Sequence, residues 1–302
     1  MTPNPSPRFL RSRLGEGVVA AVAALGVAGA AARPDPAREA ERWVAQALRP
    51  MTLDQKVGQL LMPTFESTFI STDSARFDAL LKLVKEQHVG GFGAFGGSIP
   101  VPGVLLNPTY STVVLGQPLE AAAMANRLQQ ASALPLLVAA DFEFGPGMRI
   151  NGATTFPRAM AFGAAGDESL AREAGRITGL EARAMGVHVN FAPVADGNNN
   201  PRNPVINTRS FGEDPRRVGA LAAAFVRGLH EGGALATLKH FPGHGDTDVD
   251  SHLGLPIIRH PRERLEAIEI VPFRAAIADG ADAVMTAHIQ LPAFDAAPDS
   301  PA

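Results

Sequence analysis

Apolar and polar positions alternate along the chain in a way that predicts a regular succession of helices and strands. Segments with apolar residues three and four positions apart alternate with short, almost continuous apolar runs. The helical spacing predicts helices at 36–59, 73–88, 117–132, 167–186, 214–231 and 261–279. The apolar runs predict strands at 60–65, 89–95, 134–143, 187–196, 234–241 and 281–289. Such runs are typical of a parallel sheet that is covered by helices.

Polar residues stand at the C-terminal ends of four predicted strands, namely at Asp141, Asp196, Lys239–His240 and His288. This placement favours an α/β fold of the (β/α)8 TIM-barrel type, in which the active-site loops follow the strands. A doubly wound sheet is disfavoured, because no helix begins directly at the glycines of 89–97.

The predicted barrel is incomplete, because only about six strand–helix units are visible where eight are needed. Residues 292–302 have the composition of a loop. We therefore expect the chain to be a C-terminally truncated part of a longer protein. A single domain is predicted over 36–302.

Residues 1–32 have the pattern of a secretory signal peptide. Arg8, Arg11 and Arg13 precede a small, apolar run at 18–32. We expect export to the periplasm or the medium, with cleavage near 30–33 and no stable membrane insertion afterwards. An uncleaved membrane anchor formed by the same segment is the alternative.

Composition narrows the possible functions further. The 302 residues are 46% hydrophobic and carry a net charge of −3, so a large core is available and a nucleic-acid partner is not expected. The sequence has no cysteine, which excludes disulfides, thiolate catalysis and cysteine-ligated zinc. We expect no cofactor.

The segment 239–256, KHFPGHGDTDVDSHLGLP, carries the densest candidate chemistry. Asp250 precedes His252 by two positions, and a carboxylate beside an imidazole can orient it as a general acid/base. An isolated pair of this kind would most simply be a solvated loop. The neighbouring His244, the glycines and the position after a strand favour a catalytic function.

Lys239 ends a buried strand, where a charge is costly unless it meets a ligand or a partner. An ion pair with Asp141 or Asp196 and contact with a ligand are both compatible with this position. Arg149 follows the strand at 134–143 and could bind a hydroxyl-rich or anionic ligand, or lie on the surface.

A divalent metal is an alternative use of the same segment. The potential ligands are His240, His244, Asp246, Asp248 and His252. The sequence lacks HEXXH, and the run at 246–250 departs from a calcium loop because Ser251 replaces its glycine and Ile257 its glutamate. We therefore predict no metal.

Three segments resemble the glycoside hydrolases of family 3, and more narrowly their bacterial β-N-acetylglucosaminidase branch. These segments are LPLLVAADFE with the following MR, NFAPVADGNNNPRNPVINTRSFGEDP and KHFPGHGDTDVDSH. The similarity extends from Met51 to Pro292. It implies the N-terminal barrel domain of a retaining exo-glycosidase that removes terminal non-reducing N-acetyl-β-D-glucosamine.

The resemblance also implies roles for individual residues. His252 would be the general acid/base with Asp250 as its partner, and the substrate would be bound by Asp141, Arg149, Arg209, Lys239 and His240. The family's nucleophile follows a seventh strand beyond 286–289, so we expect no residue of this chain to be the nucleophile. Phe144 and Pro146 depart from the family's glycine-rich pattern and leave the role of Glu143 open.

The substrate implied by the resemblance is a glycan or muropeptide that contains N-acetylglucosamine, as in peptidoglycan turnover. A neutral histidine acid/base would also tolerate an anionic acceptor, so phosphorolysis is conceivable beside hydrolysis. Three alternatives stay open: a β-glucosidase or β-xylosidase of the same family, an inactive sugar-binding fragment, and a metallohydrolase on the same type of barrel.

Overall fold

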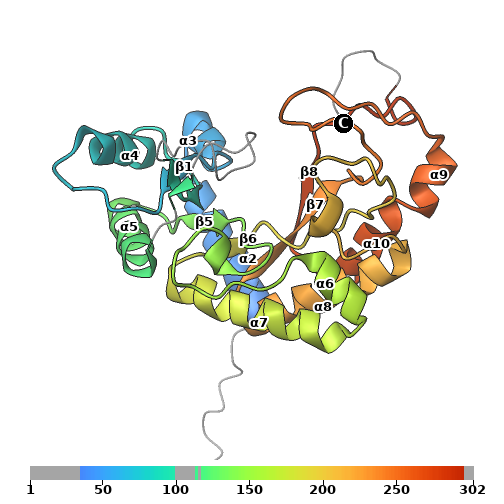
Figure 1. Ribbon diagram of the computed structural model, residues 1–302. Coiled ribbons are helices and arrows are strands. Elements are labelled where there is room, and N and C mark those ends of the chain that lie inside the picture. Colours follow the sequence, from blue (N-terminus) through green and yellow to red (C-terminus); the bar gives the residue numbers. More distant parts are fainter. Residues whose placement is uncertain (1–34, 99–112, 115–116, 296–302) are drawn as a thin grey trace, which may run out of the picture. The chain divides into compact units, whose positions relative to one another are not determined.

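The computed structural model of the protein describes residues 35–98, 113–114 and 117–295 (Figure 1). The chain divides into two compact units, residues 1–52 and 53–302. The described part of the first unit is helix α2 (Pro36–Leu48), whose first turn is capped by Asp35 as it accepts a bond from the Ala37 amide at 3.1 Å. The predicted signal peptide at 1–32 lies outside the described residues. Within the described part of the chain, no helix has the length and apolarity to cross a bilayer.

The second unit contains a six-stranded parallel sheet in the order β1-β2-β5-β6-β7-β8. Its strands are β1 (Thr64–Glu66), β2 (Gly91–Phe95), β5 (Leu137–Ala140), β6 (Val189–Asn190), β7 (Leu235–Phe241) and β8 (Ala283–Thr286). The order in the sheet follows the order in the chain, without the reversal that defines doubly wound sheets. The predicted α/β class with a parallel sheet is confirmed.

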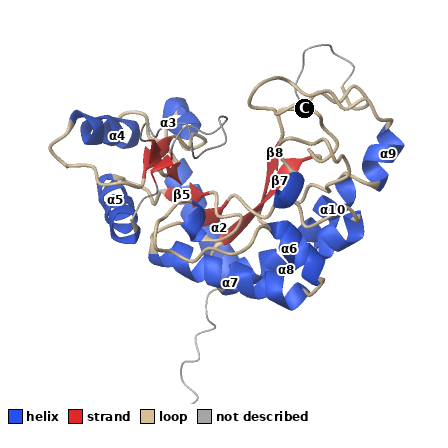
Figure 2. Cartoon of the chain, viewed as in Figure 1, coloured by secondary structure: helices blue, strands red, loops and turns tan. Residues whose placement is uncertain are grey.

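Helices follow the strands, as the apolar pattern predicts (Figure 2). Helix α3 (Leu53–Gly58) precedes β1. The helices that follow strands are α4 (Ala75–Lys85), α5 (Pro118–Ala131), α6 (Ala159–Ala165), α7 (Glu168–Ala184), α8 (Pro215–Glu231), α9 (Arg262–Ala267) and α10 (Ile270–Ala278). Two 3-10 turns, η1 (Pro146–Met148) and η2 (Asn207–Arg209), and a small antiparallel pair, β3 (Gly97–Ser98) with β4 (Val113–Val114), complete the described elements.

Several predicted elements have different bounds in the structure, among them the strand predicted at 187–196, which is only Val189–Asn190. Three of the differences have a local cause. The segment 261–279 forms two helices because Pro272 lacks an amide hydrogen and its ring conflicts with the carbonyl of Ile268, four residues earlier. The helix predicted at 36–59 is also divided, since Pro50, two residues after the end of α2, has no amide hydrogen with which to continue the helix. The strand predicted at 60–65 begins only at Thr64, because Leu60 and Leu61 instead close the turn after α3. Helix α6 was not predicted.

Helices α7 and α8 pack closely because glycines line their contact. A Cβ atom at Gly228 would lie 1.9 Å from the carbonyl oxygen of Arg172, and one at Gly175 would lie 2.3 Å from that of Phe225. The same α8 presents buried apolar residues to α10 and β7. This packing fixes β7, the strand whose C-terminal end carries the candidate chemistry.

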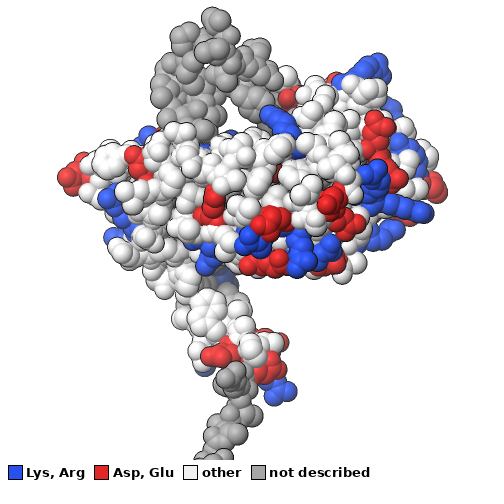
Figure 3. Space-filling model, turned by 60° about the horizontal axis from the view of Figure 1, so that its bottom comes forward, with Lys and Arg blue, Asp and Glu red and all other residues white. Residues whose placement is uncertain are grey.

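The outer surface of α7 and α8 carries charges of both signs. Figure 3 shows Lys and Arg side chains interspersed with Asp and Glu side chains on the side of the unit that these helices form. Arg176 pairs with Glu173 at 2.6 Å, and Arg227 pairs with Asp279. Exposed pairs of this kind contribute little to stability and mainly keep the surface soluble.

Half-buried His188 makes the stability of the fold depend on pH. The Val138 amide donates to His188 Nδ1 at 3.1 Å, and burial, together with nearby Arg183, lowers the pKa of the imidazole from its usual 6.5. The unfolded chain therefore binds the proton first as the pH falls, so stability drops below pH 6.5, by at most about 1.4 kcal/mol per pH unit. Urea unfolding at pH 7.5 and 5.5 should show a smaller loss for His188→Asn than for the unmodified chain. Equal losses in both proteins would contradict this expectation.

Candidate active site

The C-terminal end of β7 places a buried lysine between two carboxylates. Lys239 Nζ lies 2.7 Å from Asp141 Oδ1 and 2.7 Å from Glu143 Oε1, and its side chain is 3% exposed. Both carboxylates follow β5, and β5 and β7 flank β6 in the sheet. The sequence allowed either Asp141 or Asp196 as the partner of Lys239, and the structure selects Asp141 together with Glu143.

Two arginines complete this group of charges. Arg149 donates from Nη2 to Asp141 Oδ2 at 2.9 Å, and its guanidinium lies 4.9 Å from the centre of the Phe95 ring. Arg209, at the end of η2, binds Glu143 with two nitrogens at 2.9 and 2.7 Å. A bidentate contact of this kind fixes the orientation of both groups.

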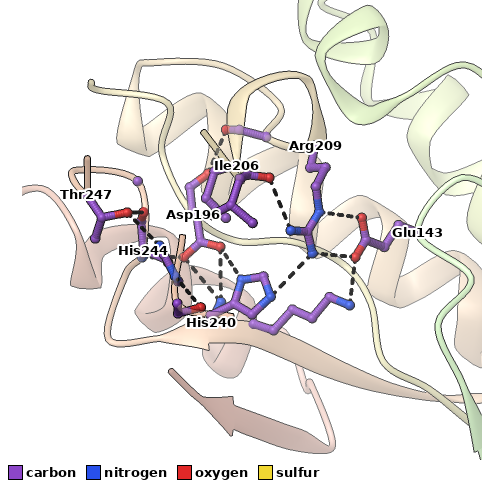
Figure 4. Close-up of polar contacts among 12 residues, drawn as sticks. Glu143, Asp196, Ile206, Arg209, His240, His244 and Thr247 are labelled. Atoms are coloured by element: carbon purple, nitrogen blue, oxygen red, sulfur yellow. Dashed lines mark hydrogen bonds and ion pairs between the residues drawn. The ribbon is translucent and has the colours of Figure 1, made fainter. Parts of the chain in front are cut away.

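Asp196 organises the other side of the group from a fully buried position. It accepts hydrogen bonds from the His240 amide, from His240 Nδ1 at 2.7 Å and from the His244 amide at 2.7 Å. Arg209 Nη2 lies 3.4 Å from His240 Nε2, and Figure 4 shows the imidazole between Asp196 and Arg209. Since an arginine can only donate, these contacts assign His240 as the tautomer with hydrogen on Nδ1.

The three acids of this cluster are held ionised. Burial alone would raise the pKa of Glu143, but Lys239 and Arg209 outweigh it and hold that pKa well below its ordinary value. Lys239 and Arg149 likewise lower the pKa of Asp141 against the effect of burial. Contacts with His240 and the His244 amide do the same for Asp196.

These residues form what we call the strand-end cluster: Asp141, Glu143, Arg149, Asp196, Arg209, Lys239 and His240. Its three carboxylates are matched in number by Arg149, Arg209 and Lys239, so the cluster presents oriented donors and acceptors with little net charge. Such a site suits a neutral ligand with several hydroxyl groups. All five residues predicted to bind substrate belong to it, whereas His288 is exposed beyond the end of β8.

Glu143 is the member whose role the sequence left open. Its central place became visible only with the fold, although its position two residues after Asp141 was a usable signal. The departures at Phe144 and Pro146 leave this geometry in place. Phe144 packs beneath the Arg158 guanidinium at 5.3 Å, and Pro146 opens the η1 turn that leads to Arg149.

Asp250 and His252 form a second, more exposed group. His252 Nδ1 lies 2.7 Å from Asp250 Oδ1, which also accepts the His252 amide at 2.9 Å. The imidazole is 68% exposed, whereas the carboxylate is 12% exposed. Burial tends to raise the pKa of Asp250, but the bonds from His252 lower it. Because Nδ1 is held, Nε2 is the nitrogen of His252 that can exchange a proton with a ligand.

The structure brings the five predicted binding residues together and places the Asp250–His252 pair on the loop that follows β7. Among the described residues, this pair is connected to the cluster through Ser251 and His244.

Four of the five potential metal ligands, His240, His244, Asp246 and His252, have other hydrogen-bond partners. Asp246 accepts from His260 Nε2 at 2.6 Å, and His244 bonds to Thr247 and Ser251. Over the part of the chain that the structure describes, no group of three or more His, Cys, Asp or Glu side chains is arranged to hold a metal ion.

A parallel α/β unit with a polar cluster at the C-terminal ends of its strands defines the class: a barrel-type scaffold with its site on the strand-end loops. Residues 52–302 match the family model for the glycosyl hydrolase family 3 N-terminal domain, and the chain belongs to this family. The solved structures similar to it include the glycoside hydrolase family 3 β-N-acetylglucosaminidase of Paenibacillus sp. str. FPU-7. That structure aligns with a TM-score of 0.72 and 45% identity over 83% of this chain and 44% of the Paenibacillus chain.

Curated relatives give the same family. The chain is 40% identical over 263 residues to β-hexosaminidase A of Pseudoalteromonas piscicida, covering 82% of this chain and 42% of the relative. It is 34% identical over 255 residues to the β-N-acetylglucosaminidase/β-glucosidase of Cellulomonas fimi, covering 84% and 41%. The chain thus spans about two fifths of the length of these relatives.

Proposed function

We propose that the protein is a retaining exo-glycosidase that removes terminal non-reducing N-acetyl-β-D-glucosamine from glycans or muropeptides. The Asp250–His252 contact of 2.7 Å carries this proposal, because it fixes an imidazole as a general acid/base next to a hydroxyl-binding cluster. The names of the Pseudoalteromonas and Paenibacillus relatives support the choice of sugar.

In this mechanism the strand-end cluster binds the sugar through its hydroxyl groups. His252 then donates the proton on Nε2 to the glycosidic oxygen as the bond to the leaving group breaks. A carboxylate attacks the anomeric carbon and forms a glycosyl-enzyme intermediate. In the second step the same nitrogen takes a proton from the water that releases the sugar. Asp250 stabilises the imidazolium whenever His252 is protonated.

The attacking carboxylate is not assigned to the cluster. Asp141 and Glu143 are neutralised by cations within 2.9 Å, and Asp196 accepts hydrogen bonds from His240 Nδ1 and the His244 amide at 2.7 Å. A nucleophile engaged in this way would attack poorly. That this chain contributes no nucleophile stays a prediction.

Two measurements test the function together. The hydrolysis of p-nitrophenyl N-acetyl-β-glucosaminide, glucoside and xyloside is compared for this chain and for the product of the gene's complete reading frame. Binding of N-acetylglucosamine to this chain is measured by calorimetry. We expect the complete product to prefer the N-acetylglucosaminide at least about tenfold in kcat/KM, which corresponds to about 1.4 kcal/mol, and this chain to bind the sugar without turnover.

Each possible result bears on a different part of the proposal. A preference for the glucoside would favour the alternative activity that the name of the Cellulomonas relative includes. Robust turnover by this chain would contradict only the prediction about the nucleophile. If the complete product cleaves none of the three substrates and this chain does not bind the sugar, the proposed function is wrong.

A further inference from the structure

The Asp250–His252 pair lies on a loop outside the regular elements, and His252 is largely exposed. An acid/base group must nevertheless be placed within a fraction of an ångström, since a misplacement of about 1 Å can cost about 10²-fold in rate. Some fixed point of the fold therefore has to hold the residues between Gly245 and His252.

His244 has the contacts that such a fixed point requires. Its residue is 2% exposed, and its amide donates to the buried carboxylate of Asp196 at 2.7 Å. Its ring reaches in the other direction along the chain, with Nδ1 2.8 Å from Thr247 Oγ1 and Nε2 3.0 Å from Ser251 Oγ. Ser251 is the residue between Asp250 and His252.

The surrounding bonds determine which ring nitrogen of His244 carries hydrogen. The Thr247 hydroxyl donates to the His244 carbonyl at 3.1 Å, so its oxygen must accept from His244 Nδ1. Nδ1 therefore carries the hydrogen, and Nε2 offers its lone pair to the Ser251 hydroxyl.

The environment keeps His244 in this neutral form. Burial lowers the pKa of the imidazole, and the opposing influence of Asp196 does not restore it. Asn203 donates to the carbonyls of His244 and Gly245 at 2.8 and 2.9 Å, which holds the backbone at the root of the loop.

We infer that His244 is a positioning residue for the acid/base pair and acts through its hydrogen bond from Ser251. This inference rests on the proposed function, because it assigns His244 to the placement of the group that transfers the proton. It adds a residue to the reaction that does not touch the substrate itself. Asp196 serves both groups, since it holds His240 in the cluster and the amide of His244 at the root of the loop.

Kinetic measurements on the complete reading-frame product test the role in the reaction. Ser251→Ala is expected to lower kcat about 10- to 100-fold with KM changed less than about threefold, because the sugar-binding cluster is untouched. Ser251→Thr keeps the hydroxyl and should retain most of the activity. Val249→Ala is the matched control on the same loop, where the side chain is 40% exposed, and should behave like the unmodified enzyme.

Substrates with different leaving groups distinguish a misplaced general acid from an overall loss of activity. A 2,4-dinitrophenyl leaving group needs little protonation, so Ser251→Ala should slow its release much less than that of a p-nitrophenyl or alkyl group. Variants of His244 separate its two ring contacts. His244→Gln can still accept from Ser251 and should be the milder change, whereas His244→Asn keeps only the donor towards Thr247 and should resemble Ser251→Ala.

Amide hydrogen exchange on this chain provides a measurement that needs no activity. The amides of His252, Leu253 and Gly254 all donate to Asp250 and should exchange at least about tenfold faster in Ser251→Ala, while β7 amides stay protected. Unchanged exchange together with unchanged kcat would overturn the inference. Faster exchange in this chain, together with no glycoside hydrolysis by the complete product and no sugar binding by this chain, would support the structural link and overturn the proposed function alone.

Discussion

Lys239→Met is expected to lower the free energy of unfolding by about 3–5 kcal/mol. The substitution keeps the length of the side chain but leaves Asp141 and Glu143 without the cation that each meets at 2.7 Å. Both carboxylates are largely buried, with side chains 15% and 7% exposed, so water cannot replace the ammonium group. Urea unfolding followed by circular dichroism would measure the loss.

Two further variants make this expectation specific. Lys85→Met removes an exposed lysine at the end of α4 and should change stability by less than about 0.5 kcal/mol. Combining Lys239→Met with Glu143→Gln removes one of the two carboxylates that lose this cation and should recover part of the loss, with a coupling energy of about 0.5–3 kcal/mol. A loss below about 1 kcal/mol for Lys239→Met alone would show that the pairs are far less buried than the structure indicates.

His252→Ala should reduce kcat/KM of the complete reading-frame product about 10²- to 10⁴-fold for p-nitrophenyl N-acetyl-β-glucosaminide. The reason is the loss of the proton donor and acceptor on Nε2, which the proposed mechanism uses in both steps. The melting temperature should hardly change, because the imidazole is 68% exposed. Steady-state kinetics and thermal unfolding would be measured on the same preparation.

His230→Ala provides the matched control, since it removes a partly exposed histidine on α8, where it contacts Asp282 at 2.7 Å. Its kcat/KM should stay within about twofold of the unmodified value, well inside the factor expected of a general acid. Full activity of His252→Ala would remove this residue from the mechanism. The strand-end cluster would then need another proton donor.

The comparison of sequence and structure shows where local patterns suffice. The Asp250–His252 contact was predictable because it joins residues two positions apart, so it depends on a short stretch of chain. The parallel sheet was predictable from apolar runs that alternate with helical spacing. The ends of these elements were harder to predict. The helical spacing of apolar residues continues through Pro272, but the proline cannot be accommodated in the middle of a helix, so 261–279 forms two helices.

The ion-pair partners within the cluster could not be predicted from the sequence. Lys239 had two candidate acids, and only the neighbourhood of β5, β6 and β7 assigned it to Asp141, 98 positions away. The pairing of Arg209 with Glu143, 66 positions apart, was likewise invisible in the apolar pattern. That pattern reports which face of an element is buried, and it carries no information about which charges meet at the end of a sheet.

The sequence by itself determined the class of fold, the family and the loop that carries the proposed acid/base pair, because each depends on periodicity or on residues close together in the chain. Only the tertiary structure decided how the charges of the cluster are shared, that Asp196 holds His240, and that His244 connects this buried group to Ser251. These contacts arise when parallel strands bring their C-terminal ends to one edge of the sheet, and burial there makes every unpaired charge costly.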